Sequence, residues 1–250
     1  MSQRKFNTLY VSDLDGTLLN EKSRISALTA RTLNRLIDNG ICFTIATART
    51  PATVVKLMNE VRLNLPVVLM TGALTYDIAR DKYLSVSSFD IDVSACLMDV
   101  ISQTGSSPMV YYIDNGLLHV AYRRPLSNRQ RFFISQRKGT PYKQYVEVRG
   151  SLSARKETIL IFFMDVYERL EAIYDAISCI EGHCSYLYRD SLLPELGYLE
   201  IYPSGTSKAD AIEQLAIKLD VSEIVAFGDN LNDIVLSLFF IRIFLLGKCS

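Results

Sequence analysis

Two aspartates with the right chemistry for phosphate stand two residues apart near the start of the chain, where residues 13–18 read DLDGTL. They follow Leu9-Tyr10-Val11, an apolar run typical of a short buried strand. Carboxylates crowded at a strand end repel each other unless a cation lies between them, and Mg²⁺ prefers oxygen ligands, including phosphate oxygens. The pattern therefore indicates a metal-assisted phosphate site with one aspartate available as a nucleophile. An acidic Asp-Gly turn after a strand explains the same six residues equally well.

The composition sets limits on the class of protein. The chain has 250 residues, 49% of them hydrophobic, which is enough for one large domain or two smaller ones. Lys+Arg and Asp+Glu are equal at 27 each, so net charge gives no argument for nucleic acid or an acidic membrane. Residues 1–6 lack the apolar core of a signal peptide, and five scattered cysteines fit reduced thiols. These features predict a cytoplasmic protein without a membrane partner.

The elements that must position the aspartates alternate between strand and helix. Ser26 can start a helix that ends near Gly40, residues 41–46 read as a buried strand, and Thr50-Pro51 starts a second helix. Residues 67–70 form the next strand. This βαβαβ order predicts a doubly wound, Rossmann-like parallel sheet. The same alternation returns near Gly205, with a helix after residue 207 and a strand at residues 224–227.

The middle of the chain has a different pattern. An Asp-Asn-Gly turn at residues 114–116 separates two apolar runs, which is a strong hairpin signal. Further strands are expected at residues 158–164, 186–188 and 198–202, and a helix at residues 167–180. Hairpins mixed with helices indicate an α+β module inserted into the first fold. The expected organisation is a core domain of residues 1–82 and 196–250 with an inserted cap domain of residues 83–195.

Four chemical signals fall at strand or helix ends of the predicted core: Asp13 with Asp15, Thr47, Lys208, and Asp229 with Asp233. In a parallel sheet these ends can meet at one edge. Residues 13–18, 46–49 (ATAR), 207–209 (SKA) and 228–234 (GDNLNDI) match, in order, the four motifs of the haloacid-dehalogenase-like phosphatases. The chain resembles the Cof-type branch of that family, which has a large α/β cap. The resemblance extends to about residue 234.

The resemblance implies a role for each phosphate-side residue. Asp13 would attack phosphorus and form an aspartyl-phosphate, and Asp15 would protonate the leaving oxygen and later activate water. Thr47 and Lys208 would hold the phosphoryl oxygens. Such roles agree with phosphoryl transfer, in which positioning and cationic groups supply most of the catalysis. Taken singly, Thr47 would ordinarily be interpreted as a buried structural residue. Lys208 taken singly would be interpreted as a solvated lysine on a helix.

The resemblance also implies a cofactor and a substrate class. Mg²⁺ would be held by Asp13, the backbone carbonyl of Asp15, and Asp229. Asn232 would support the phosphate side, and Asp233 would tether its loop. The expected activity is a Mg²⁺-dependent phosphatase for a small phosphorylated metabolite resembling a sugar phosphate. We expect a monomer or weak homodimer, with no nucleic-acid partner.

The match to the family weakens at three places. Ala48 stands where the family usually has glycine, which is tolerable if its φ is negative, and Thr71 replaces a usual asparagine. Residues 235–246 read VLSLFFIRIFLL, in place of the family's helix, strand and final helix. This atypical ending suggests a truncated or frame-shifted product, although the tail can also fill the place of an edge strand. The alternative function is therefore a catalytically impaired homologue with a damaged C-terminus that only binds phosphorylated ligands.

Two further clusters have competing interpretations. Cys179, His183 and Cys184 match no standard zinc spacing, so an ordinary helix end is favoured over a metal site. Residues 115–146 contain no acid. They carry seven basic residues, which are Arg123, Arg124, Arg129, Arg131, Arg137, Lys138 and Lys143. A solvated face of the cap is favoured there, with capture of an anionic small substrate or of nucleic acid as the alternatives.

Overall fold

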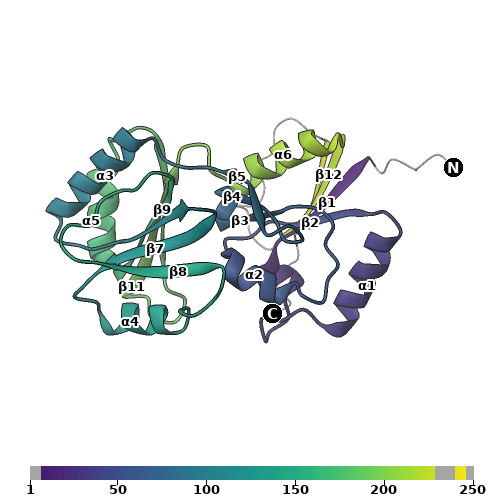
Figure 1. The fold of residues 1–250 in the computed structure, drawn as a ribbon, viewed down its shortest axis with the longest axis horizontal. Coiled ribbons are helices and arrows are strands. Elements are labelled where there is room, and N and C mark those ends of the chain that lie inside the picture. Colours follow the sequence, from purple (N-terminus) through teal and green to yellow (C-terminus); the bar gives the residue numbers. More distant parts are fainter. Residues whose placement is uncertain (1–6, 229–239, 246–250) are drawn as a thin grey trace. The chain divides into compact units, whose positions relative to one another are not determined.

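The chain forms two compact units in this computed structural model, which describes residues 7–228 and 240–245 (Figure 1). The core unit comprises Met1–Ser85 and Thr206–Ser250, and the cap unit comprises Val86–Gly205. The prediction that the second core segment starts at residue 196 needs correction. Strand β11, Leu196–Pro203, pairs with β9 and β10 of the cap sheet, so the chain returns to the core only after it.

A parallel sheet is the centre of the core unit, with strand order β13-β12-β1-β2. Its strands are β1 (Thr8–Ser12), β2 (Cys42–Ile45), β12 (Glu223–Gly228) and β13 (Phe240–Leu245). All three neighbouring pairs run parallel. A parallel bridge between Ala46 and Val68 extends this arrangement toward β3 (Val67–Leu69). The predicted α/β fold with a parallel core sheet is confirmed.

The helices of the core unit begin where their capping residues predict. Helix α1 (Ala27–Asp38) starts after Ser26, whose side chain accepts a hydrogen bond from the Thr29 N–H at 3.0 Å. Helix α2 (Pro51–Leu57) starts after Thr50 and has proline in its first turn. Helix α6 (Lys208–Leu219) packs Ile212 and Ala216 against β1 and β12 in a buried apolar cluster.

A small second sheet, β3-β4-β5, completes the core unit. Strand β4 (Leu74–Asp77) runs antiparallel to β3, and β5 (Lys82–Val86) follows it. The sequence pattern did not indicate β4. The short turn Met70–Gly72 joins β3 to β4, so the chain reverses direction at the end of a core strand.

The cap unit is built on a six-stranded sheet with order β10-β11-β9-β6-β7-β8. All pairs are antiparallel except β7 with β8. Its strands are β6 (Met109–Asp114), β7 (Leu117–Arg123), β8 (Lys143–Val148), β9 (Thr158–Val166) and β10 (His183–Arg189), together with β11. The hairpin predicted at residues 114–116 is present, and Asn115 and Gly116 have positive φ as its tight turn requires.

Helices lie on both faces of the cap sheet. Helices α3 (Ile91–Gln103) and α5 (Tyr167–Ile177) bury one face in an apolar cluster that includes Val110, Ile161 and Leu199. Helix α4 (Asn128–Ser135) contacts the other face, where Phe133 packs on Phe162 with ring centroids 5.7 Å apart. Tyr111 and Tyr198 lie on this second face as well, since the ring of each contacts Phe162.

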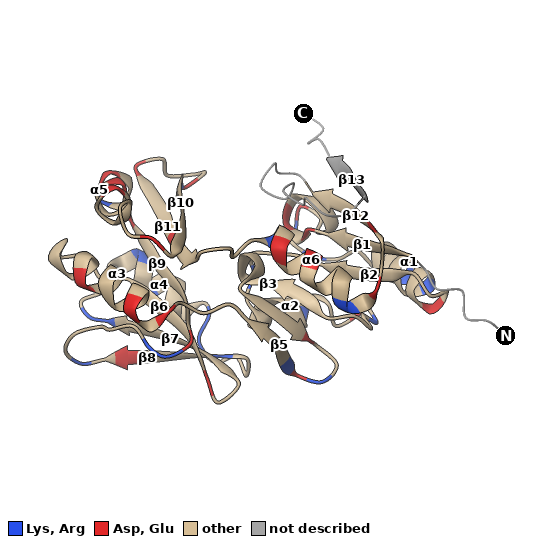
Figure 2. Ribbon diagram, turned by 90° about the horizontal axis from the view of Figure 1, so that it is seen from above, with Lys and Arg blue, Asp and Glu red and all other residues tan. Residues whose placement is uncertain are grey.

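Helices α1 and α6 carry charges of both signs, whereas α3 carries only acidic and α4 only basic charged side chains. Figure 2 shows acidic and basic positions interspersed on helices such as α1 and α6, in keeping with the balanced composition. Within the part of the chain that the structure describes, no helix has the length and apolar character needed to cross a bilayer.

Candidate functional site

Asp13 lies at the end of β1, in the middle of the parallel core sheet. Its backbone is extended, and its N–H donates to the Phe227 carbonyl of neighbouring β12 at 2.9 Å. The Ser12 hydroxyl donates to the Asp13 carbonyl at 2.8 Å. These bonds fix the backbone on both sides of the carboxylate, whose side chain is only 12% exposed.

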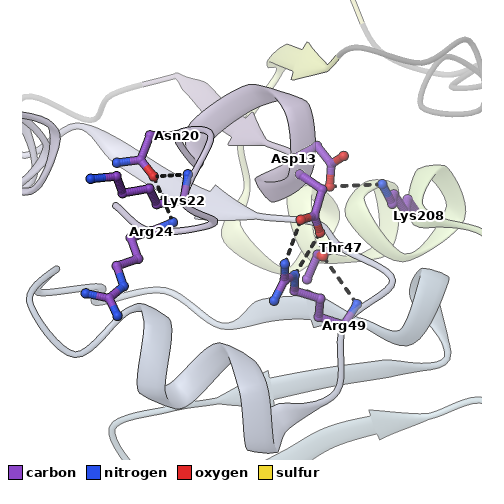
Figure 3. A network of polar contacts seen from close by, with 8 residues as sticks. Asp13, Asn20, Lys22, Arg24, Thr47, Arg49 and Lys208 are labelled. Carbon is purple, nitrogen blue, oxygen red and sulfur yellow. Dashed lines mark hydrogen bonds and ion pairs between the residues drawn. The ribbon is translucent and has the colours of Figure 1, made fainter. Parts of the chain in front are cut away.

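Lys208 faces Asp13 from the first position of helix α6, as Figure 3 shows. Its Nζ lies 3.1 Å from a carboxylate oxygen of Asp13, and its side chain is 17% exposed. Ser207 caps the helix by accepting a hydrogen bond from the Asp210 N–H at 3.0 Å. A lysine ammonium at the positive end of a helix dipole is a favourable place for phosphoryl oxygens.

The start of α6 packs directly on Gly72, in the turn after β3. A Cβ added to Gly72 would lie 2.0 Å from the Ser207 carbonyl oxygen, and the φ of Gly72 is +101°. Met70 and Thr71 also have positive φ, at 49° and 57°. Three successive positive φ values make a strained turn, and a β-branched threonine is a costly residue to hold there. Only glycine fits at position 72, so this turn sets the position of Lys208.

Thr47 follows β2, the strand next to β1, and is almost fully buried. Its N–H donates to the Val68 carbonyl at 3.0 Å, and its carbonyl accepts from the Thr71 N–H at 3.2 Å. The Thr47 hydroxyl oxygen accepts from the Arg49 N–H at 3.2 Å. Ala48, between them, is exposed and has a negative φ, so the replacement of glycine causes no backbone strain.

Arg49 holds Asp15 with a two-pronged ion pair. Arg49 Nε lies 2.7 Å from one carboxylate oxygen of Asp15, and Nη2 lies 2.6 Å from the other (Figure 3). This pairing is the main reason that the pKa of Asp15 lies below its ordinary value, although partial burial acts in the opposite direction. Asp15 is therefore a carboxylate at neutral pH, with its orientation set by the guanidinium.

The segment after the aspartates forms a hydrogen-bonded loop before helix α1. It passes through the irregular helical turn Leu14–Leu18 and then through Asn20, whose side-chain oxygen accepts from the Lys22 and Arg24 N–H groups at 3.0 and 3.1 Å. Figure 3 shows this loop beside the aspartates. The bonds hold the loop without using the Lys22 and Arg24 side chains.

A small pocket opens beside the Asp13–Lys208 pair. It is lined by these two residues and by Phe227, with apolar side chains of β1, β12 and α6 as its walls. Apolar walls strengthen the interaction of a phosphoryl group with the lysine, because they keep water away from it. The pocket lies wholly within the core unit.

The donors near Asp13 suit a hard divalent cation. The carboxylate of Asp13 and the backbone carbonyl of Asp15 offer oxygen atoms, the kind of donor that Mg²⁺ prefers. Strand β12 ends at Gly228 beside β1, so the chain enters the segment with Asp229 from the adjacent strand end. Asp229, Asn232 and Asp233 lie outside the described residues. Within the described part of the chain, no group of three or more His, Cys, Asp or Glu side chains could hold a metal.

Four predicted residues therefore come from three separate segments to one edge of the core sheet: Asp13 and Asp15, Thr47, and Lys208. Two residues that hold them were given no role in the sequence analysis. Arg49 stands inside the second motif, and its position two residues after Thr47 was the available signal. Gly72 gave no comparable signal, because its importance depends on contact with a helix far along the chain.

The chain matches the sequence model of one protein family and resembles several curated proteins. The sequence model described as haloacid dehalogenase-like hydrolase matches residues 10–237. A 5-amino-6-(5-phospho-D-ribitylamino)uracil phosphatase of Bacillus subtilis, YwtE, is 26% identical over 89% of this chain and 81% of its own length. A putative phosphatase of Mycoplasma pneumoniae is 25% identical over 90% and 80%. An Arabidopsis thaliana chloroplastic endoribonuclease, YBEY, is 26% identical over 92% of this chain. This chain spans only 39% of the length of that relative.

Solved structures show the same fold at low sequence identity. A haloacid dehalogenase-like hydrolase from Bacteroides thetaiotaomicron has a TM-score of 0.70 at 21% identity, covering 91% of this chain and 84% of its own. TM0651 from Thermotoga maritima has a TM-score of 0.69 at 20% identity, covering 91% and 81%. These likenesses establish the combination of core and cap architecture for this chain.

Proposed function

The chain belongs to the haloacid dehalogenase-like hydrolases, and from that premise we propose that it is a Mg²⁺-dependent phosphatase acting on a small phosphorylated metabolite. The curated relatives support this substrate class. Two Bacillus subtilis relatives, YwtE and YitU, are named as phosphatases of a phosphoribityl-aminouracil, in which a sugar-alcohol phosphate is the reacting part. The proposed substrate is correspondingly a sugar-phosphate-like monoester.

The observation that carries the proposal is the Asp13–Lys208 pair. A largely buried carboxylate at a strand end lies 3.1 Å from a lysine ammonium at a helix N-terminus, with Thr47 at the neighbouring strand end. A phosphate bound between Lys208 and Thr47 would bring its phosphorus next to the Asp13 carboxylate. Positioning of this kind supplies most of the rate enhancement in phosphoryl transfer.

In the proposed reaction, a carboxylate oxygen of Asp13 attacks phosphorus while the bond from phosphorus to the ester oxygen breaks. The Asp15 carboxylic acid gives its proton to the departing oxygen, which leaves as an alcohol. The resulting Asp15 carboxylate then takes a proton from water, whose oxygen attacks phosphorus and releases phosphate from Asp13. Lys208 and Thr47 hold the phosphoryl oxygens through both steps.

In the proposed mechanism, Arg49 controls the protonation state of Asp15. In the free protein it keeps Asp15 ionised and oriented. An arriving phosphate dianion attracts the same guanidinium and repels the Asp15 carboxylate, and both effects raise the pKa of Asp15. Substrate binding would thus favour the protonated form that a general acid needs.

When bound, Mg²⁺ would neutralise charge between the phosphoryl group and the site, which lowers the repulsion that Asp13 must overcome. Asp13, the Asp15 backbone carbonyl and Asp229 would hold it. Asn232 and Asp233 would support the phosphate side and the loop of Asp229. Asp13 can then attack without a separate base, because it is already ionised.

The alternative is a homologue that binds phosphorylated ligands without hydrolysing them because its C-terminal segment is damaged. Its physical basis is the atypical sequence after residue 234, part of which lies outside the described residues. Backbone pairing of β12 with β13 in parallel register weakens this alternative, since β12 has a neighbour on its outer side. Turnover decides between the two functions.

The test is hydrolysis of p-nitrophenyl phosphate by the full chain with and without Mg²⁺. We expect turnover that exhaustive EDTA treatment abolishes, and Asp13→Asn should reduce kcat by at least about a thousandfold, because an amide is no acceptor for the phosphoryl group. Asp99→Asn, a matched change at an exposed position of α3, should leave kcat unchanged. Wild-type turnover in Asp13→Asn would overturn the nucleophile assignment, and activity resistant to EDTA would overturn the metal.

The proposed location is the cytoplasm. Three cysteines in the described part of the chain, Cys42, Cys96 and Cys179, are free thiols. Free thiols suit a reducing compartment, in which small phosphorylated metabolites are also available. Thiol labelling of the protein in intact cells would test this, since blocked cysteines would contradict it.

A further inference from the structure

The second face of the cap sheet, which α4 contacts, gathers basic and phenolic groups on three neighbouring strands. Strand register places Tyr111 of β6 opposite Val120 of β7, and Val120 opposite Tyr145 of β8. Lys143 lies two residues before Tyr145 on β8, so both side chains project from the same face. The residues of β8 that alternate with these two project to the opposite face, which α3 and α5 cover. There Val148 packs against the apolar cluster.

Lys143 departs from the expectation of a solvated basic stretch. It is only 5% exposed, whereas most other basic residues of this stretch are exposed. Its Nζ lies 5.3 Å from the centre of the Tyr145 ring. Within residues 7–228 and 240–245, no carboxylate lies at ion-pair distance from it. Burying a charge without an opposite charge is costly, so this lysine needs an explanation.

Arg137 adds a second cation at the rim of the same region. Its guanidinium stacks on the Phe133 ring at 3.9 Å and donates to the Phe133 carbonyl at 3.3 Å, and no carboxylate of the described chain pairs with it. Its positive charge adds to the effect of burial in lowering the pKa of Lys143 to about 8. The same charge also acts on the Tyr111 and Tyr145 hydroxyls, so Arg137 lies within electrostatic reach of all three.

The hydroxyl of Tyr145 is buried and has no hydrogen-bond partner in the described structure. A buried donor without an acceptor costs free energy, as does a buried cation without an anion. Lys143, Arg137 and Tyr145 all offer donors toward one region of the face. What this region lacks is a negatively charged acceptor.

Two carboxylates on strands of this sheet, Glu200 and Glu147, are engaged with other partners. Glu200 on β11 accepts from the Tyr188 hydroxyl at 2.8 Å and the Tyr202 hydroxyl at 3.1 Å. Glu147, two residues beyond Tyr145, pairs with Arg124 at 3.0 Å. Neither can neutralise Lys143 without breaking these contacts.

We propose that Lys143, Arg137 and Tyr145 form a cap anion site that binds an oxyanion, either a carboxylate or a phosphoryl group, of a small molecule. A charged guanidinium and ammonium beside a phenol donor provide the charge and directional bonds that such a group needs. If the oxyanion is a second charged group of the substrate, the inference rests on the proposed function. If it is a free anion, the site stands apart from catalysis.

The test compares ligands that differ by one oxyanion. Binding to the full chain is measured by calorimetry in the Asp13→Asn background, with 6-phosphogluconate against glucose 6-phosphate, and with citrate as an anion that has no phosphate. We expect the extra carboxylate of 6-phosphogluconate to improve Kd by at least about tenfold. Lys143→Met should remove this advantage. Lys156→Met, a matched charge loss at an exposed cap position, should retain it.

A second variant guards against a folding defect in Lys143→Met. Tyr145→Phe removes only the unpartnered hydroxyl, so it should fold as well as the parent and should still weaken 6-phosphogluconate binding by a few-fold. Citrate binding that depends on Lys143 would assign the site to a free anion. A preference for 6-phosphogluconate without citrate binding would assign it to a second group of the substrate.

Failure of this inference is separable from failure of the proposed function. Equal Kd values for the two sugar phosphates together with no citrate binding would overturn the cap anion site, whatever the turnover. Binding advantages that survive both Lys143→Met and Tyr145→Phe would overturn it as well. Turnover of p-nitrophenyl phosphate, which has no second anion, tests the phosphatase alone.

Discussion

Replacing Gly72 by alanine tests how the strained turn controls the position of Lys208. The change introduces two separate costs. A Cβ at φ +101° is a backbone conformation that L-residues rarely adopt, which costs about 1–3 kcal/mol. The same Cβ would lie 2.0 Å from the Ser207 carbonyl oxygen and 2.4 Å from its carbon. Ordinary contacts of carbon with carbonyl oxygen are about 3.3 Å or longer, so Ser207 must move by about 1 Å.

Gly150→Ala is a matched control for the backbone cost. Gly150 has φ +96°, close to that of Gly72, but a Cβ added there meets nothing within 4 Å. The difference between the two variants therefore isolates the contact with Ser207. An overpacked contact costs about 1–3 kcal/mol, which lowers the melting temperature of a chain this size by about 2–4 °C per kcal/mol. We expect Gly72→Ala to melt at least about 3 °C below Gly150→Ala.

The effect on activity should be larger than the effect on stability. Lys208 immediately follows Ser207, so the shift of the backbone displaces its ammonium from the 3.1 Å contact with Asp13. A displacement of about 1 Å in a positioned group can cost about a hundredfold in rate. Measured with p-nitrophenyl phosphate, kcat/KM should fall by about this factor in Gly72→Ala and stay near wild type in Gly150→Ala. Equal activity and equal melting temperature in the two variants would refute the positioning role of Gly72.

Two further predictions concern titrating groups. Arg49→Met should raise the pKa of Asp15 toward its ordinary value, and Arg49→Lys should give an intermediate pKa, because lysine keeps the charge but loses the two-pronged geometry. Carboxyl NMR titration of the metal-free protein measures the pKa of Asp15 in each variant. An unchanged pKa in Arg49→Met would contradict the pairing. Burial lowers the pKa of Lys143 to about 8 from 10.5, so between these pH values the unfolded chain binds more protons and stability rises with pH. In denaturant unfolding, the free energy of unfolding of wild type should rise by up to about 3 kcal/mol between pH 8 and 10.5, relative to that of Lys143→Met. The same dependence of unfolding free energy on pH in both proteins would refute the buried charge.

Local sequence patterns were sufficient to predict the elements that carry the site. Strands β1, β2 and β12 are short apolar runs followed by polar residues, and the parallel arrangement of the sheet then brings their ends together. The capping residues Ser26 and Ser207 mark helix starts with the same reliability, because a cap is satisfied within three residues of itself. Predictions of this kind depend only on neighbouring residues.

Features that depend on distant contacts were not predictable in this way. Strand β11 is a short segment rich in apolar residues, like the core strands, and only its pairing with β9 and β10 assigns it to the cap. The burial of Lys143 was likewise hidden, because a run of basic residues ordinarily indicates a solvated surface. In both cases the partner strand, and not the local sequence, decides the environment.

The insertion of the cap explains why the site depends on such distant contacts. The core unit consists of two chain segments, and the cap sequence separates them completely. Several contacts rejoin these segments at the site. Among them are the pairing of β1 with β12, the bond from the Asp13 N–H to the Phe227 carbonyl, the Asp13–Lys208 ion pair and the packing of Gly72 on Ser207. The nucleophile candidate Asp13 belongs to the first segment, whereas Lys208 belongs to the second. Their distance is therefore set by how the core closes around the insertion, which makes the strained glycine turn as important to the chemistry as the charged residues themselves.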